Sequence, residues 1–278
     1  MFLLGLLYVV FIAVLIAVGV NLLLVIVIAG ALLFVQYRYS DRLALAAMRA
    51  RVVEPPDAPD LHAMIDRLCV QADLPKPRIA IADTRMPNAF ASGRSPKAAV
   101  VCATTGLLEA LEPHELEGVM AHELAHVQNR DVAVMTIASF LAVVAGLMTR
   151  MGFFGFGGGG RGSNAAGFAL VLLASILVYA LSFLLIRALS RYREYAADRG
   201  AAVITGRPSG LASALVKISG MMDRVPRRDL RAAQPLNAFF ILPAGVERSL
   251  GELLATHPPM EKRIARLEEL ERQLHGVR

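Results

Sequence analysis

The chain has 278 residues, of which 56% are hydrophobic, and it carries a formal charge of +6. The hydrophobic residues are concentrated in long uncharged blocks, which is typical of a membrane protein and excludes an ordinary soluble domain. The basic residues form no single stripe, so the charge does not indicate nucleic-acid binding, and two cysteines are too few for a cysteine-based zinc cluster.

The first block, residues 1–37, contains no Asp, Glu, Lys or Arg. A helix needs about 20 apolar residues to cross a bilayer, so this block is too long for one crossing. We expect two short helices, 2–18 and 22–37, that turn near Asn21 and form a transmembrane hairpin. A cleaved signal peptide is the alternative, but the block lacks a charged N-terminal region and a small-residue cleavage site.

Residues 38–131 are expected to form the first part of a cytoplasmic protease domain. Apolar side chains at helical spacing predict a helix over 60–72, and residues 78–82, 88–92 and 98–103 are strand candidates.

A short helix is expected over 106–111, with Thr105 as its cap.

One of these strand candidates is also a candidate substrate site. It contains Asn88, Ala89, Phe90 and Ala91, and turn residues flank it. We expect an exposed edge strand that pairs with an extended substrate through its main chain. An ordinary core strand is the alternative.

Residues 119–131, VMAHELAHVQNRD, contain a His-Glu-Leu-Ala-His motif. His122 and His126 are four positions apart and share one face of a helix, so two imidazoles can bind one cation. Glu123 is placed to hold a water on that cation and to take its proton. Because no Gly or Pro follows until Gly146, we expect this helix to continue into the next apolar block.

Two further uncharged blocks, 132–149 and 162–186, fit one membrane crossing each. They predict a transmembrane hairpin over 132–186, with a glycine-rich external turn. Because most flanking basic residues lie in 38–131 and 187–278, the positive-inside rule places both of these segments in the cytoplasm. Together with the first hairpin, the chain is expected to have about four transmembrane helices.

The second part of the protease domain, 187–278, begins with an acidic pair on a helix. Glu194 and Asp198 are four positions apart in the sequence RYREYAAD. Glu194 can be the third metal ligand, and Asp198 can accept the free N–H of a ligating histidine. An exposed helix face, paired with Arg191 and Arg193, is the alternative.

Four segments together resemble the HtpX membrane zinc endopeptidases, which are relatives of the CAAX prenyl proteases. The segments are the His-Glu motif, Ser190–Asp198, Thr256–Ile264 and Pro87–Gly93. The resemblance implies a mainly α-helical membrane protein in which a helical zincin-type metalloprotease domain with a small β-sheet is fused to the transmembrane helices. It also implies one Zn²⁺ per chain and a location in the bacterial inner membrane.

The resemblance assigns roles to individual residues. It implies that His122, His126 and Glu194 bind the zinc and that Glu123 is the catalytic base. It also places His257 and Arg263 near the metal.

We expect His257 to donate a hydrogen bond to the tetrahedral intermediate, and Arg263 to help it or to hold a carboxylate of the site. In the alternative, His257 caps a final helix that begins near Met260, and Arg263 pairs with Glu252 or Glu261.

The predicted function is an integral-membrane zinc metalloendopeptidase that hydrolyses misfolded or damaged membrane proteins during stress. Its partners would be these substrates and the lipid bilayer, with no nucleic acid. One alternative is a CAAX-type prenyl protease, whose additional spans enclose a chamber. The other is a non-catalytic, zinc-stabilised membrane scaffold, although such proteins usually lose the glutamate found here at position 123.

Overall fold

The computed structural model describes residues 22–154, 165–222 and 257–276. The chain divides into two compact units, one formed by residues 1–37 and 134–189 and the other by 38–133 and 190–278. The expected helix 2–18 and the greater part of the expected external turn lie outside the described residues.

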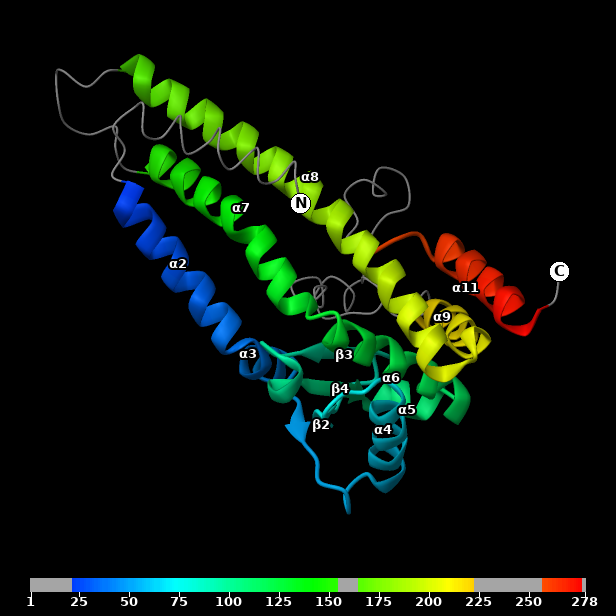
Figure 1. Cartoon of the computed structure of the whole chain (residues 1–278). Coiled ribbons are helices and arrows are strands. Elements are labelled where there is room, and N and C mark those ends of the chain that lie inside the picture. The colour runs from blue at the N-terminus through cyan, green and yellow to red at the C-terminus, as the bar shows by residue number, and fades with distance from the viewer. Residues whose placement is uncertain (1–21, 155–164, 223–256, 277–278) are drawn as a thin grey trace. The chain divides into compact units, whose positions relative to one another are not determined.

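Three helices carry the apolar blocks: α2 (Leu22–Arg38), α7 (Asp131–Phe154) and α8 (Ala165–Thr205) (Figure 1). The expected helix 22–37 is confirmed by α2. Within the described ranges, Leu172–Thr205 is the one helix long and apolar enough to cross a membrane, and only 17% of its most apolar 18-residue stretch is buried. The shorter apolar segments Ile26–Arg38 and Asp131–Phe140 fall below that length.

The second unit contains a small mixed sheet, as predicted. Its strands lie in the order β1 (Arg51–Val52), β2 (Arg78–Ala82), β4 (Val100–Thr104) and β3 (Ala89–Ser92). The central strands β2 and β4 are parallel, and the edge strands β1 and β3 are antiparallel to their neighbours. The three predicted strands are confirmed, whereas β1 is too short to produce a period-2 pattern in the sequence.

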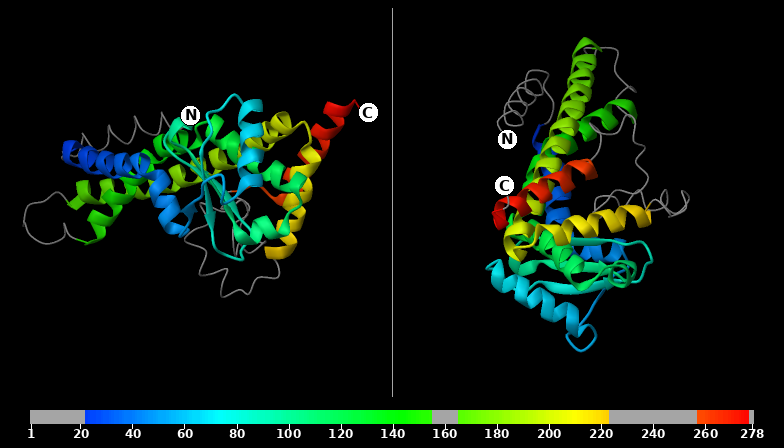
Figure 2. Two further views of the ribbon diagram at one scale, coloured as in Figure 1. Left: turned by 90° about the horizontal axis from the view of Figure 1, so that it is seen from below. Right: turned by 90° about the vertical axis from the view of Figure 1, so that its right-hand side faces the viewer.

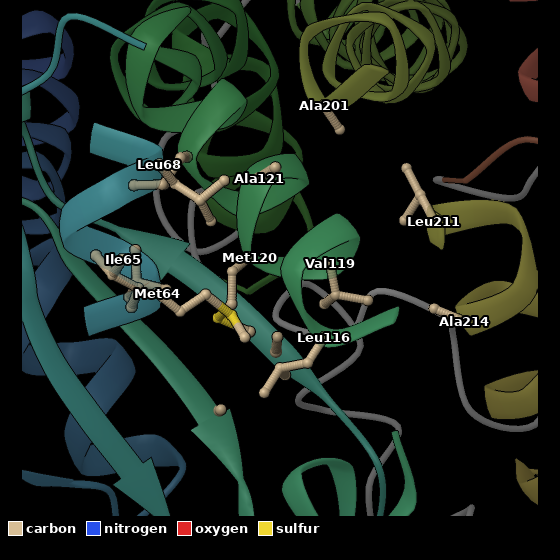
Figure 3. Packing of buried hydrophobic residues seen from close by; sticks show 14 of the residues in the cluster. Met64, Ile65, Leu68, Leu116, Val119, Met120, Ala121, Ala201, Leu211 and Ala214 are labelled. Atoms are coloured by element: carbon tan, nitrogen blue, oxygen red, sulfur yellow. The ribbon is translucent and has the colours of Figure 1, made fainter. Parts of the chain in front are cut away.

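Helix α6 (Pro113–Gln128) is the centre of this unit. It contacts both the sheet and α9 (Pro208–Met222), and α9 in turn contacts α11 (Met260–His275) (Figure 2). Figure 3 shows the core that forms where α6 meets α4 (Pro59–Gln71), with Met120 pointing toward Met64. The remaining helices are α3 (Ser40–Ala47), α5 (Thr105–Ala110) and a short 3₁₀ turn (Pro96–Ala98).

The predicted cap of the short helix α5 is wrong by one residue. Thr104, the last residue of β4, is the cap, and its hydroxyl accepts a hydrogen bond from the Leu107 N–H at 3.2 Å. Thr104 can do this because its backbone is still extended, as a capping residue requires, whereas Thr105 is already helical.

The prediction of one continuous helix through the His-Glu motif into the apolar block is also wrong. Helix α6 ends at Gln128 and α7 begins at Asp131, because Arg130 adopts a left-handed conformation with φ of 54°. This conformation is unfavourable for a residue with a side chain. A residue far along the chain stabilises this corner between α6 and α7: Arg193 of α8 donates a hydrogen bond to the Asn129 carbonyl at 3.0 Å.

Candidate metal centre

The start of α6 sets the register of the His-Glu motif. Glu112 and Glu115 form a reciprocal capping box, and Pro113 occupies the first turn. Two full turns later, His122 and His126 project from one face with their rings edge to face and their Nε2 atoms 3.1 Å apart. Glu123, next to His122, is buried on the same helix.

Helix α8 brings the third candidate ligand to these histidines. Glu194 is buried, with Oε2 3.7 Å from His122 Nε2 and Oε1 3.5 Å from His126 Nε2. A glycine allows the close approach of the two helices, because a Cβ on Gly200 would lie 2.7 Å from the Cβ of Ala125. The ligand atoms of His122, His126 and Glu194 all lie within 4.8 Å of one another.

These three side chains fit a tetrahedral metal ion. Zinc binds nitrogen and oxygen ligands at about 2.0–2.2 Å, so neighbouring ligands of a tetrahedral site lie roughly 3.3–3.5 Å apart. The distances between the ligand atoms of His122, His126 and Glu194 are 3.1, 3.5 and 3.7 Å, which is close to that range. Two neutral imidazoles and one carboxylate also leave a fourth position for water, which is the ligand set of a catalytic rather than a structural zinc site.

A carboxylate lies behind each histidine, on the ring nitrogen that faces away from the ligand cluster. Asp198 Oδ1 lies 3.0 Å from His122 Nδ1. Arg263 of α11 holds Asp198 with two hydrogen bonds, of 2.9 and 2.7 Å, and is itself fully buried. The structure thus places Asp198 where the sequence predicted it, beside a candidate ligand.

The carboxylate behind His126 was missed by the sequence analysis. Asp131 Oδ2 lies 2.6 Å from His126 Nδ1, and Arg193 forms an ion pair with Asp131. The sequence contains one weak signal for it, an isolated acidic residue at the start of an apolar block. The contact itself depends on the break between α6 and α7, and no Gly or Pro in the sequence indicates that break.

The pKa values of the two histidines in the metal-free site are shifted in opposite directions. Burial lowers the pKa of His122, but the hydrogen bond with Asp198 outweighs it and raises the pKa to about 9. Burial and the neighbouring charge of His122 lower the pKa of His126. Because the His122 ring is protonated at neutral pH when no metal is bound, a metal ion at its Nε2 would have to displace a proton.

His257 and Arg263 reach the same cluster from the C-terminal segment. His257 Nδ1 lies 3.1 Å from Glu194 Oε2, and Arg263 Nη1 lies 3.5 Å from the same oxygen. Helix α11 begins at Met260, as expected, but its capping residue is Pro259 and no side chain caps it. The alternative in which His257 caps this helix is therefore wrong.

The candidate substrate strand β3 lies at an edge of the sheet and contacts α6. Asn88, Ala89 and Phe90 are buried, their main chain included, and Ala91 is half-buried. The strand is therefore at an edge of the sheet, as expected, but the expectation that it is exposed is wrong for all but Ala91. Thr104 N–H bonds to the Asn88 carbonyl at 2.9 Å, which makes Asn88 a hydrogen-bonded position of the β3–β4 pair. Because these positions alternate, the backbone groups of Ala89 and Ala91 point away from β4, toward the edge of the sheet.

A helix that carries His-Glu-x-x-His, joined by a glutamate from a second helix, defines a metalloprotease. The sequence matches Peptidase family M48 over residues 55–271. The chain therefore belongs to peptidase family M48.

Its relatives include protease HtpX homolog 1 of Streptomyces coelicolor, which is 56% identical over 99% of this chain and 91% of the relative. Protease HtpX homolog 2 of Methanosarcina acetivorans is 53% identical over 99% of this chain and 94% of its own length. A homolog from Moorella thermoacetica is 54% identical over 100% of this chain and 94% of its own. The resemblance to the HtpX proteases and the predicted class, a membrane metalloprotease, are thus confirmed.

A crystal structure of S. mikatae Ste24p has the same fold. It superposes with a TM-score of 0.61 at 19% identity, over 95% of this chain. This chain spans 62% of that longer one, so the likeness supports the predicted fold class, a mostly helical protease with a small sheet, and no more.

Proposed function

We propose that the chain is a zinc-dependent endopeptidase, anchored in the bacterial inner membrane by about four helices, that hydrolyses misfolded or damaged membrane proteins at its cytoplasmic side. The observation that carries the proposal is the cluster of three ligand atoms, from His122, His126 and Glu194, within 4.8 Å of one another. The apolar helices and the protease relatives support the membrane location and the protein substrate.

In this proposal His122, His126 and Glu194 hold the zinc, and Glu123 is the general base. When bound, zinc supplies a Lewis acid that acidifies a water molecule and polarises the scissile carbonyl. The Glu123 carboxylate takes the proton from the attacking water and delivers it to the leaving amide nitrogen. Its burial supports this role, because a carboxylate screened from bulk water exchanges its proton with the substrate rather than with solvent.

Two further parts of the chain complete the proposed site. His257 donates a hydrogen bond to the oxygen that becomes negative during the reaction, and Arg263 holds Asp198 and thereby orients His122. The outward backbone groups of Ala89 and Ala91 pair with an extended substrate, which permits cleavage of unfolded segments with little sequence preference.

The test is the Glu123→Gln variant of the full-length protein in detergent micelles, assayed for zinc content and for casein cleavage. It should retain zinc and lose activity, because a base that is not a ligand has been neutralised. His122→Ala should lose both zinc and activity. Glu117→Gln is the matched control on the same helix, since Glu117 pairs with Arg67 at 3.7 Å and lies outside the ligand cluster.

Two results would contradict the proposal. Full activity in Glu123→Gln would remove the assignment of the base, and a wild-type protein that binds zinc without cleaving any protein would favour a scaffold. Preferential cleavage of a prenylated peptide over unfolded membrane proteins would instead favour a CAAX-type protease. A comparison of the membrane proteins that accumulate with Glu123→Gln and with wild type would identify the substrates.

A further inference from the structure

Both candidate metal-binding histidines are held by the same arrangement of three side chains. In one, Arg263 pairs with Asp198, and Asp198 contacts His122 Nδ1. In the other, Arg193 pairs with Asp131, and Asp131 contacts His126 Nδ1 at 2.6 Å. The second set is not part of the His-Glu motif or of the acidic pair on α8.

A carboxylate on Nδ1 decides what the other ring nitrogen can do. An ionised carboxylate only accepts hydrogen bonds, so in a neutral imidazole Nδ1 must carry the proton and Nε2 keeps a free lone pair. His126 Nε2 is the atom that faces His122 Nε2, at 3.1 Å, and Glu194 Oε1, at 3.5 Å. Asp131 therefore directs the lone pair of His126 into the ligand cluster.

We infer that Asp131 is a positioning residue for the metal ligand His126, and that Arg193 holds Asp131 in place. The inference rests on the proposed function in so far as His126 binds the metal. Arg193 is the residue directly before Glu194 and also donates a hydrogen bond to the Asn129 carbonyl at the end of α6. The same side chain thus ties the corner of α6 and α7 to the turn of α8 that carries the third ligand.

The test is a zinc titration of purified, metal-stripped full-length protein against a competing chelator. Asp131→Asn should weaken zinc binding by about 10–100-fold, the usual cost of losing such a partner. Asp41→Asn is the matched control, because Asp41 also pairs with an arginine, Arg78, but between α3 and β2. His126→Ala sets the affinity expected when the ligand itself is lost.

A second readout separates positioning from a merely structural role. The melting temperature of the metal-free protein should be similar in Asp131→Asn and Asp41→Asn, whereas the zinc dissociation constant should change only in the first. Arg193→Gln should weaken zinc binding by a smaller factor in the wild-type background and by much less in the Asp131→Asn background, because the effect of Arg193 on His126 passes through Asp131. The double variant Asp131→Asn/Arg193→Gln removes both members of the ion pair and so leaves no unpaired charge. Its zinc affinity can be measured instead if Asp131→Asn alone does not fold.

Wild-type zinc affinity in Asp131→Asn, or in the double variant, would overturn the inference while leaving the proposed function intact. Additive losses from Asp131→Asn and Arg193→Gln would overturn the coupling between the two residues. If wild type and Asp131→Asn differ in zinc affinity as expected but neither cleaves protein, the proposed function fails and the positioning role stands.

Discussion

At the scale of single residues, the two nitrogens of each candidate ligand perform different tasks. Nε2 of His122 and of His126 points into the ligand cluster, and each Nδ1 faces a carboxylate. The arginines that pair with these carboxylates hold them in place, so each imidazole is held in one orientation. A site built in this way loses little entropy when a metal binds.

The first residue-scale prediction concerns His257, whose side chain is 12% exposed and lies beside Glu194. His257→Ala should retain zinc and lower kcat by about 10²–10³-fold with little change in KM, because a donor to the developing oxyanion is lost. The measurement is steady-state cleavage of a peptide together with zinc content. His114→Ala is the control, since His114 is a partly exposed histidine at the start of α6. A loss of zinc in His257→Ala would show instead that His257 holds Glu194.

The second residue-scale prediction concerns Glu115, which lies in the first turn of α6 and is buried. Burial alone would raise the pKa of the Glu115 carboxyl. Hydrogen bonds from Lys217 and Ser213, both 2.7 Å, and from the Glu112 N–H outweigh burial and lower the pKa to about 2. The ordinary value is near 4.5, so the unfolded chain binds a proton that the folded chain does not between about pH 4.5 and 2. The stabilisation by this carboxylate is therefore complete above that window and is lost as the pH falls through it.

Glu115→Gln should accordingly lower the free energy of unfolding by about 1.5–3 kcal/mol at neutral pH, the range for a hydrogen bond to a charged group. The difference from wild type should shrink as the pH falls from 5 toward 2. Thermal melts of both proteins in detergent across this range would measure it. A difference that stays constant over the whole range would contradict the assignment.

At the scale of elements, the site depends on how closely two helices pack. Gly200 permits α8 to approach α6 at Ala125, between the two histidines, and Gly118 permits α9 to approach the same helix near Leu211. A Cβ at either position would lie closer to its neighbour than real Cβ atoms do, so the neighbour would have to shift. The position of Glu194 relative to His122 is therefore set by packing on the face of α6 rather than by the motif itself.

The prediction at this scale tests β3 as the substrate strand. Ala89→Pro removes an N–H that points away from β4, so no hydrogen bond to β4 is lost. It should raise KM at least tenfold or abolish cleavage, with zinc content unchanged. Val52→Pro is the matched control, because Val52 lies on β1 at the opposite edge, and the bond from Val53 N–H to the Ile79 carbonyl places the Val52 N–H outward as well.

Equal kinetics in Ala89→Pro and Val52→Pro, with both proteins folded, would show that β3 does not pair with the substrate.

At the scale of the whole molecule, the site joins three segments that are far apart in the chain. The histidines come from α6, Glu194 and Asp198 from α8, and His257 and Arg263 from the C-terminal segment. A metal that binds only the folded chain stabilises all of them together. Metal removal should therefore lower the stability of this unit as a whole rather than loosen one loop.

The whole-molecule prediction is a metal-dependent melting temperature. Zinc at 100 times its dissociation constant should add about 2.7 kcal/mol to the free energy of unfolding. For a unit of this size that corresponds to roughly 5–11 °C. Melting curves with zinc and with a chelator would measure the shift. Glu123→Gln should show the same shift as wild type and His126→Ala should show none; an equal shift in His126→Ala would place the metal elsewhere.

The local patterns of the sequence were sufficient for several features: the apolar helix α2, the three main strands, and the pairs His122/His126 and Glu194/Asp198, which the structure brings together. These features depend on spacings of two to four residues, which any sequence displays directly. Only the tertiary structure decided the break at Arg130, the contact of Asp131 with His126, and the pairing of Arg263 with Asp198. These depend on partners 64 and 65 positions away, as in Arg193–Asn129 and Arg263–Asp198. A left-handed arginine and an acidic residue that turns back onto the preceding helix are unfavourable locally, and they exist here because α8 supplies Arg193, which contacts both Asn129 and Asp131.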